Sequence, residues 1–180
     1  FEHDACGIGA VVNVKGHKSH ETISDALLML SNMEHRGGRG SDPKTGDGAG
    51  VLIQLPHTFL KEVTQRLGFG LPEEGCYGVG MVFFPNNKQL YKKCKSNLNK
   101  IINELGFKLI GYRAVPTDDT VPGSGALEVM PTIEQVFVEH KDNLSGIDLE
   151  RKLYILRNYS TRIINSTIPG VTSAFYVARV

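Results

Sequence analysis

Cys6 is the residue of this sequence whose setting suggests chemistry most directly. It lies between Ala5 and Gly7, immediately before the apolar run 8–12. Removal of the short peptide 1–5 would give Cys6 both a thiol and a free α-amino group. A thiolate is a nucleophile, and an α-amine with a pKa of about 8 can take the thiol proton at neutral pH. Gly7 and Gly9 are expected to leave room for a substrate to approach the backbone. The alternative is that Cys6 is a small buried apolar residue of a strand, as most unpaired cysteines are.

Arg36 and Gly37 form the second candidate pair. They stand at the expected end of a helix, where an arginine is commonly a solvated charge near the negative end of the helix dipole. The functional alternative is that Arg36 reaches back to support the site at Cys6, while Gly37 lets its backbone approach the same place. The residue types alone leave both interpretations open.

A glycine-rich loop runs from Arg36 to Gly50 and contains six glycines and one proline in fifteen residues. This composition predicts irregular backbone. The loop matches neither the GxGxxG fingerprint nor the phosphate-loop pattern, because no Gly-Lys-Ser/Thr follows it. It therefore either surrounds a catalytic cysteine or is plain turn structure.

The remaining histidines and cysteines show no metal-site spacing such as HExxH or CxxC. His35 could pair with the thiol of Cys6, face solvent or cap the helix. Cys76 and Cys94 are expected to be core residues. Three widely spaced cysteines do not form a disulfide framework and favour a reducing compartment, so we expect a cytoplasmic protein.

Strands and helices alternate along the chain that positions these residues. Apolar, β-branched runs predict strands at 7–14, 51–55, 77–84, 107–115, 132–139 and 173–180. Apolar residues at helical spacing predict helices over 19–36, 57–67, 88–105 and 145–168. Ser19 is the expected N-cap of the first helix, and Ser145-x-x-Asp148 is a capping pattern that opens the last. The second helix is expected to carry Phe59, Leu60, Val63 and Leu67 inward. A loop is predicted at 116–125. The order predicts an α+β fold in which helices cover the faces of a sheet.

Bulk composition excludes several classes of function. The 180 residues carry a net charge of +1, which gives no reason to expect nucleic acid or an anionic membrane as a partner. No apolar stretch approaches the ~20 residues that span a bilayer. The first residues show no secretory signal pattern, and the length suits one domain with a real core.

Five segments together resemble a known family, and they do so in order along the whole chain. They are Cys6-Gly-Ile-Gly9, Met33-Glu-His-Arg-Gly37, Thr45-Gly-Asp-Gly-Ala-Gly50, Gly78-Val-Gly-Met-Val-Phe-Phe-Pro85 and Glu150-Arg-Lys-Leu-Tyr154. This set is similar to the amino-terminal class II glutamine amidotransferase domain of glutamate synthase large subunits, and more to the bacterial members. Because several ordered motifs agree, the resemblance does not depend on a single short match.

The resemblance implies the N-terminal-nucleophile (Ntn) hydrolase fold, an αββα sandwich of two antiparallel sheets between helix layers. It implies a propeptide remnant at residues 1–5 and the front part of the amidotransferase domain at 6–180. Cys6 would be the nucleophile that attacks the side-chain amide of glutamine. Ammonia would leave, and water would hydrolyse the resulting γ-glutamyl thioester. Arg36 and Gly37 would be active-site members, with Arg36 in a structural and electrostatic role.

For the full-length parent, the resemblance implies that ammonia travels to a distant site where 2-oxoglutarate is aminated and reduced. FMN, an iron–sulfur cluster and NADPH or ferredoxin would serve that site, and no cofactor or metal is expected within this segment. The implied partners are glutamine as substrate, the rest of the large subunit, and a small subunit or ferredoxin. Neither nucleic acid nor a membrane is expected.

Two departures from the family lead us to expect that this 180-residue chain is inactive alone. Residues 1–5 still block the α-amine of Cys6, and the family's glutamine-binding arginine and its Asn-Gly oxyanion-hole pair are expected beyond Val180. Loss of one oxyanion-hole donor lowers the rate by ~10²–10³. Two other interpretations remain open at this point: a non-catalytic binding or regulatory module with the same fold, and another Ntn-type cysteine amidohydrolase.

Overall fold

The computed structural model describes residues 7–38, 40, 42, 44–171 and 174–178. These residues form two compact units. The first lies within Phe1–Pro56 and Asp118–Glu128, and the second within His57–Thr117 and Val129–Val180. The candidate arginine and its neighbouring glycine belong to the first unit, whereas the sheet belongs to the second.

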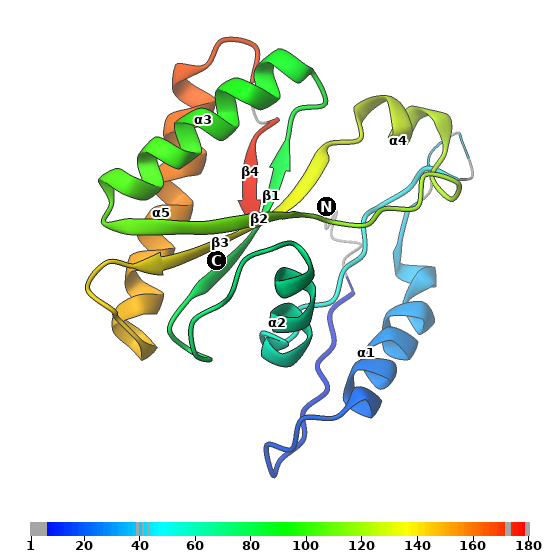
Figure 1. The fold of residues 1–180 in the computed structure, drawn as a ribbon. Helices are drawn as coiled ribbons and strands as arrows, with labels where there is room; N and C mark the ends of the chain where they lie inside the picture. The colour runs from blue at the N-terminus through cyan, green and yellow to red at the C-terminus, as the bar shows by residue number, and fades with distance from the viewer. Residues whose placement is uncertain (1–6, 39, 41, 43, 172–173, 179–180) are drawn as a thin grey trace, which may run out of the picture. The chain divides into compact units, whose positions relative to one another are not determined.

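The second unit is built on a four-stranded antiparallel sheet (Figure 1). The strands are β1 (Gly78–Phe84), β2 (Phe107–Ala114), β3 (Thr132–His140) and β4 (Tyr176–Ala178). Their spatial order is β2-β3-β1-β4. Four of the predicted strands are thereby confirmed. The last is shorter than predicted, and part of its predicted range lies outside the described residues.

Helices α3 (Lys88–Glu104) and α5 (Gly146–Thr167) cover one face of this sheet (Figure 1). The side chain of Asn87 begins α3 by accepting hydrogen bonds from two backbone N–H groups. Ser145 precedes α5, but its side chain makes no capping hydrogen bond, so the predicted capping box is wrong in that detail. The apolar core between helices and sheet includes Val82, Phe84, Cys94, Leu98, Ile101, Val136, Val138, Leu153, Leu156 and Ile164.

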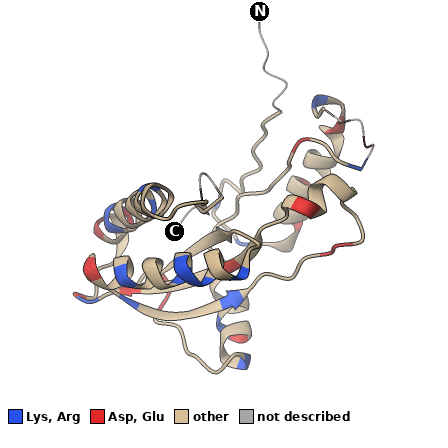
Figure 2. Cartoon of the chain, turned by 90° about the horizontal axis from the view of Figure 1, so that it is seen from above, with Lys and Arg blue, Asp and Glu red and all other residues tan. Residues whose placement is uncertain are grey.

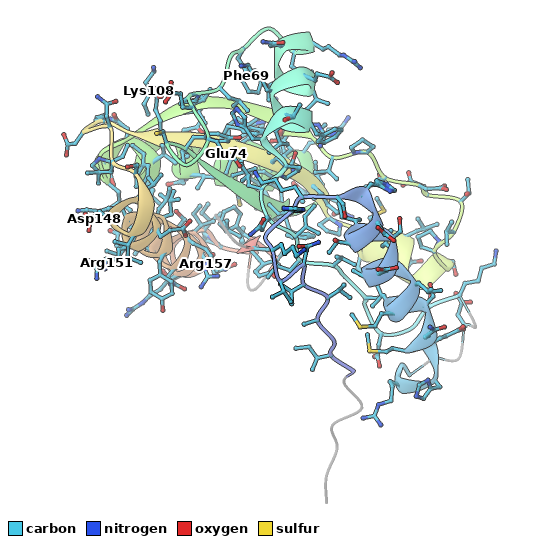
Figure 3. The ribbon with its side chains drawn as sticks, turned by 90° about the horizontal axis from the view of Figure 1, so that it is seen from below. Phe69, Glu74, Lys108, Asp148, Arg151 and Arg157 are labelled. Carbon is cyan, nitrogen blue, oxygen red and sulfur yellow. The ribbon has the colours of Figure 1, made fainter. Side chains whose placement is uncertain are left out.

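The opposite face of the sheet is covered by α2 (His57–Arg66) and the loop that follows it. Leu60 of α2 is only 2% exposed, as predicted. Phe59 and Leu67, which were also predicted to face inward, are 51% and 55% exposed. The loop residue Phe69 (Figure 3) supplies the missing apolar contact by packing edge-on against Phe137.

Phe69 lies directly over Gly111 of β2. A methyl group placed on Gly111 would lie 2.8 Å from two atoms of the Phe69 ring. We therefore expect Gly111→Ala to lower the free energy of unfolding by about 1–3 kcal/mol, because the ring must leave its position on the sheet. Chemical denaturation of this chain measures the change.

Gly70→Ala is the matched control for this prediction, because no atom lies within 4 Å of the added methyl group. Its effect is expected to stay within about 0.5 kcal/mol. Equal unfolding midpoints for the Gly70 and Gly111 variants would contradict the packing of Phe69 described above.

One lysine of α3, Lys95, is half-buried. Lys95 Nζ lies 2.6 Å from Glu134 Oε2 and 2.8 Å from the Tyr91 hydroxyl. Burial alone lowers the pKa of Lys95, but the hydrogen bonds with Glu134 and Tyr91 outweigh burial and raise it. Lys95 thus stays charged and neutralises the buried carboxylate. The other lysines of α3 are exposed along the helix (Figure 2): Lys88, Lys92, Lys93 and Lys100.

The first unit contains α1 (His20–Asn32), the 3-10 turn η1 (Glu34–Arg36) and the beginning of α4 (Ser124–Val129). Ser19 accepts a hydrogen bond from the backbone N–H of Thr22, which confirms its predicted role as the N-cap of α1. Helix α4 was not predicted, because its six residues are too few to show a helical period. The apolar side of α1 is at most half-buried.

The predicted buried strands at 7–14 and 51–55 are wrong for the described structure, in which both segments have irregular backbone. Ile8, Val14 and Leu52 are 98%, 95% and 72% exposed. An apolar run becomes a buried strand only when a neighbouring strand pairs with its backbone and a second layer covers its side chains. Among the described residues, no strand pairs with either segment.

Within the described ranges, no helix is both long enough and apolar enough to cross a membrane.

Candidate active site

Cys6 lies outside the described residues, so its role as nucleophile stays a prediction. Gly7, the next residue along the chain, packs against the end of α1 and against η1. A methyl group placed on Gly7 would lie 3.0 Å from Met33 Sδ and 3.4 Å from both Cβ and Cγ of Arg36. The structure therefore places the stem of Arg36 beside the residue that adjoins Cys6.

Gly9 continues this contact along α1. A side chain on Gly9 would overlap the thioether of Met29, just as one on Gly7 would press on Met33. The sequence led us to expect that these glycines leave room for a substrate. That expectation is wrong for the space in which a Cβ atom of either residue would lie, because side chains of α1 and η1 fill it. The glycines instead allow segment 7–9 to lie close to the helix.

Backbone hydrogen bonds fix the position of Arg36 at the end of η1. Its N–H donates to the carbonyl of Met33 at 2.8 Å, and the N–H of Gly37 donates to the carbonyl of Glu34 at 3.1 Å. Gly37 then leaves the turn in an extended conformation with φ −88° and ψ 145°, which any residue can adopt. A methyl group there would meet only the Glu34 carbonyl, at 3.5 Å. The predicted close approach at Gly37 therefore stays a prediction.

The glycine-rich loop folds back on itself directly after Gly37. The N–H of Asp47 donates to the carbonyl of Gly38 at 2.9 Å, and the N–H of Gly38 donates to Oδ2 of Asp47 at 2.7 Å. Nearer the tip, the N–H of Gly40 donates to the carbonyl of Thr45 at 2.8 Å. The described residues of the loop have the predicted irregular backbone, and these bonds bring Asp47 beside Gly38, two residues after the candidate arginine.

Asp42 organises the tip of the same loop. Its carboxylate accepts hydrogen bonds from the backbone N–H of Lys44 and the hydroxyl of Thr45, each at 3.0 Å. These two bonds, with a smaller contribution from the backbone of Ser124, lower the pKa of Asp42. The N–H of Gly123 donates to the carbonyl of Lys44 at 3.2 Å. Together these contacts attach the loop tip to the start of α4.

The surroundings of His35, Cys76 and Cys94 suit structural roles better than roles in chemistry. Nδ1 of His35 lies 3.0 Å from the carbonyl of Asn32, which favours the helix-capping alternative for this histidine. Cys94 is fully buried, as predicted, and burial raises the pKa of its thiol. Cys76 is only half-buried, so its predicted core position is wrong. In the described part of the chain, no group of three His, Cys, Asp or Glu residues could hold a metal ion.

Sequence reasoning missed Asp42 and Asp47. Both stand in the glycine-rich loop, where an aspartate that accepts hydrogen bonds from nearby backbone N–H groups is a common turn device. That preference was the available signal. It could not tell which aspartate faces the residues next to Arg36, because the answer depends on how the loop closes.

Comparison with known proteins places this chain in a family. The family model for glutamine amidotransferases class-II matches residues 6–180. The chain is 44% identical to the NADPH glutamate synthase large chain of Bacillus subtilis over 161 residues, which are 87% of this chain and 10% of that protein.

Two relatives from other kingdoms show the same pattern. The NADH glutamate synthase of Schizosaccharomyces pombe is 38% identical over 98% of this chain and 8% of its own length. The chloroplastic ferredoxin-dependent glutamate synthase 2 of Arabidopsis thaliana is 36% identical over 92% of this chain and 10% of its own length. The chain thus spans about a tenth of the length of the relatives it matches.

These matches confirm the family and the α+β fold class that the ordered motifs predicted. The described residues contribute one antiparallel sheet with helices on its faces. On this evidence the chain belongs to the class II glutamine amidotransferases, in the branch of the family that includes the glutamate synthase large chains.

Proposed function

We propose that residues 6–180 are the front part of a glutamine-hydrolysing domain and that Phe1–Ala5 is a propeptide remnant. The observation that carries this proposal is the family match, which begins at Cys6. The contact between Gly7 and the stem of Arg36 adds support, because it places the first carbons of a cationic side chain against the residue that follows the proposed nucleophile in the sequence.

Removal of Phe1–Ala5 frees the α-amine of Cys6 to act as its own base. The amine takes the thiol proton, directly or through a water, and Sγ attacks the carbon of the glutamine side-chain amide. The amine then gives a proton to the departing nitrogen, which leaves as ammonia while a γ-glutamyl thioester forms on Sγ. Water hydrolyses the thioester, which releases glutamate and restores the thiol.

Arg36 and Gly37 complete the part of the site that this chain contributes. A guanidinium near a cysteine favours the thiolate, which is the reactive form. Arg36 supplies that charge and Gly37 carries the backbone past the site. The residues that hold the glutamine carboxylate and the oxyanion are proposed to lie beyond Val180.

In the full-length parent, the released ammonia serves the amination and reduction of 2-oxoglutarate at a distant site. The names of the relatives include NADPH, NADH and ferredoxin, which supports an electron donor of this kind. We propose that FMN and an iron–sulfur cluster serve the distant site, outside this segment. A small subunit or ferredoxin is the proposed partner of the full-length parent. The free thiols of Cys76 and Cys94 support a cytoplasmic location.

The proposal is tested by ammonia release from glutamine, with intact mass measured on the same sample. Full-length protein that has lost Phe1–Ala5 is expected to turn glutamine over. Full-length protein that retains Phe1–Ala5, and the 180-residue chain alone, are expected to release no ammonia. Turnover by protein that keeps Phe1–Ala5 would contradict the role of the freed amine.

A further inference from the structure

We propose that Asp47 is a positioning residue for the amidotransferase site, an inference that rests on the proposed function. Asp47 makes two hydrogen bonds with Gly38. Its Oδ2 accepts from the Gly38 N–H at 2.7 Å, and its own N–H donates to the Gly38 carbonyl at 2.9 Å. Both polar groups of one glycine are thus held by one residue nine positions away.

The side-chain bond is of the stronger kind, because a carboxylate accepts it. Glycine has no side chain of its own to restrict its backbone, so Gly38 depends on such contacts for a fixed conformation. The space beside Gly38 is also filled by Asp47, since a methyl group placed on Gly38 would lie 3.2 Å from Oδ2. The pair therefore forms a close and specific contact.

The contact between Asp47 and Gly38 matters for the site because Gly38 lies close to Arg36 in the chain. Gly38 follows Arg36 by two residues, and the stem of Arg36 rests against Gly7. On the amino-terminal side, the bonds of η1 hold Arg36 and Gly37. On the carboxyl-terminal side, the bonds with Asp47 hold the chain as it leaves Gly37. With Asp47 in place, the backbone is held on both sides of the Arg36–Gly37 pair.

Asp42 allows the effect of Asp47 on the arginine to be separated from a general role of aspartates in forming this loop. It lies in the same loop and also accepts a hydrogen bond from a backbone N–H, but its partners are Lys44 and Thr45 at the loop tip. It makes no hydrogen bond to Gly37 or Gly38 among those described. Asp42 and Asp47 therefore form a matched pair in which only one acts on the candidate arginine.

The test compares Asp47→Ala, Asp47→Asn and Asp42→Ala in the mature full-length protein. Asp47→Ala is expected to lower kcat for glutamine by about 10–100-fold with little change in KM, because a shift of about 1 Å in a positioned group has effects of this size. The rising limb of the pH–rate profile is expected to move to higher pH, because the cation no longer favours the thiolate. Asp47→Asn is expected to recover most of the loss, since its side-chain oxygen still accepts the bond from Gly38.

Asp42→Ala is expected to lower the thermal midpoint while kcat per intact site stays near the parent value. Intact sites are counted by titration with diazo-oxo-norleucine, so that partly unfolded protein does not distort kcat. A parent-like kcat for Asp47→Ala, or equal losses of kcat for Asp42→Ala and Asp47→Ala, would overturn the inference.

Failure of this inference is distinguishable from failure of the proposed function. An inactive Cys6→Ser protein together with a fully active Asp47→Ala protein would remove only the role of Asp47. Full turnover by Cys6→Ser would remove the nucleophile and the proposed function with it.

Discussion

Replacement of Cys6 by serine in the mature full-length protein is expected to lower glutamine turnover by at least about 10³-fold, as for other enzymes that lose their nucleophile. A serine hydroxyl has a far higher pKa than a thiol, so the α-amine removes its proton far less readily at neutral pH. The measurement is ammonia release from glutamine by protein whose amino terminus has been verified at residue 6 by intact mass.

Cys76→Ser is the matched control for this prediction. Cys76 is a free, half-buried thiol in the loop before β1, outside the unit that contains Arg36. Its replacement is expected to leave turnover at the parent rate. Turnover by Cys6→Ser within a few-fold of the parent would show that another group attacks the amide.

Replacement of Arg36 by leucine is expected to lower kcat/KM for glutamine by about 10²–10³-fold, the range for loss of one preorganised electrostatic group. Leucine keeps apolar bulk against Gly7 but removes the guanidinium. The thiolate then forms less readily, so the pH at which turnover rises is expected to increase. Turnover measured across pH gives both quantities, and Arg36→Lys is expected to fall between the parent and the leucine variant.

Arg66→Leu provides the control for removal of one positive charge. Arg66 is 78% exposed at the end of α2 and pairs only loosely with Glu62, at 3.7 Å. Its loss is expected to leave kcat/KM and the pH profile unchanged. If Arg36→Leu behaved like Arg66→Leu, Arg36 would be a solvated helix-end charge, the first interpretation of its sequence position.

The sheet unit was largely predictable because its elements follow from local patterns. β1 alternates buried and half-buried residues along its length, and α3 buries Cys94, Leu98 and Ile101 at helical spacing. In both elements the apolar residues meet a complete layer of partners, so the local pattern and the tertiary structure agree. Boundaries fell within a few residues of the observed ones.

The first unit was harder to predict, because strand formation there depends on partners that a local pattern does not contain. The apolar runs 7–14 and 51–55 look like buried strands, yet Ile8 is 98% exposed in the described structure. Helix α4 was missed because its six residues are too few to show a helical period.

The site was predictable in type but not in arrangement. Motifs singled out Arg36, and the structure places its Cβ and Cγ beside Gly7. The interpretation that Arg36 supports the site at Cys6 stays a prediction. The contribution of Asp47 was not visible, because two aspartates of one loop have the same turn preference and only the folded loop separates their partners.

Labelling of the mature full-length protein with diazo-oxo-norleucine, an electrophile that mimics glutamine, tests whether Cys6 is the nucleophile that attacks glutamine. The label is located by peptide mass mapping, with and without glutamine present. We expect one label, on Cys6, that forms more slowly when glutamine competes. Cys94 is buried with a raised pKa and is expected to stay unlabelled. Labelling of Cys76 in place of Cys6, or labelling of Cys6 that glutamine does not slow, would contradict the role of Cys6 as that nucleophile.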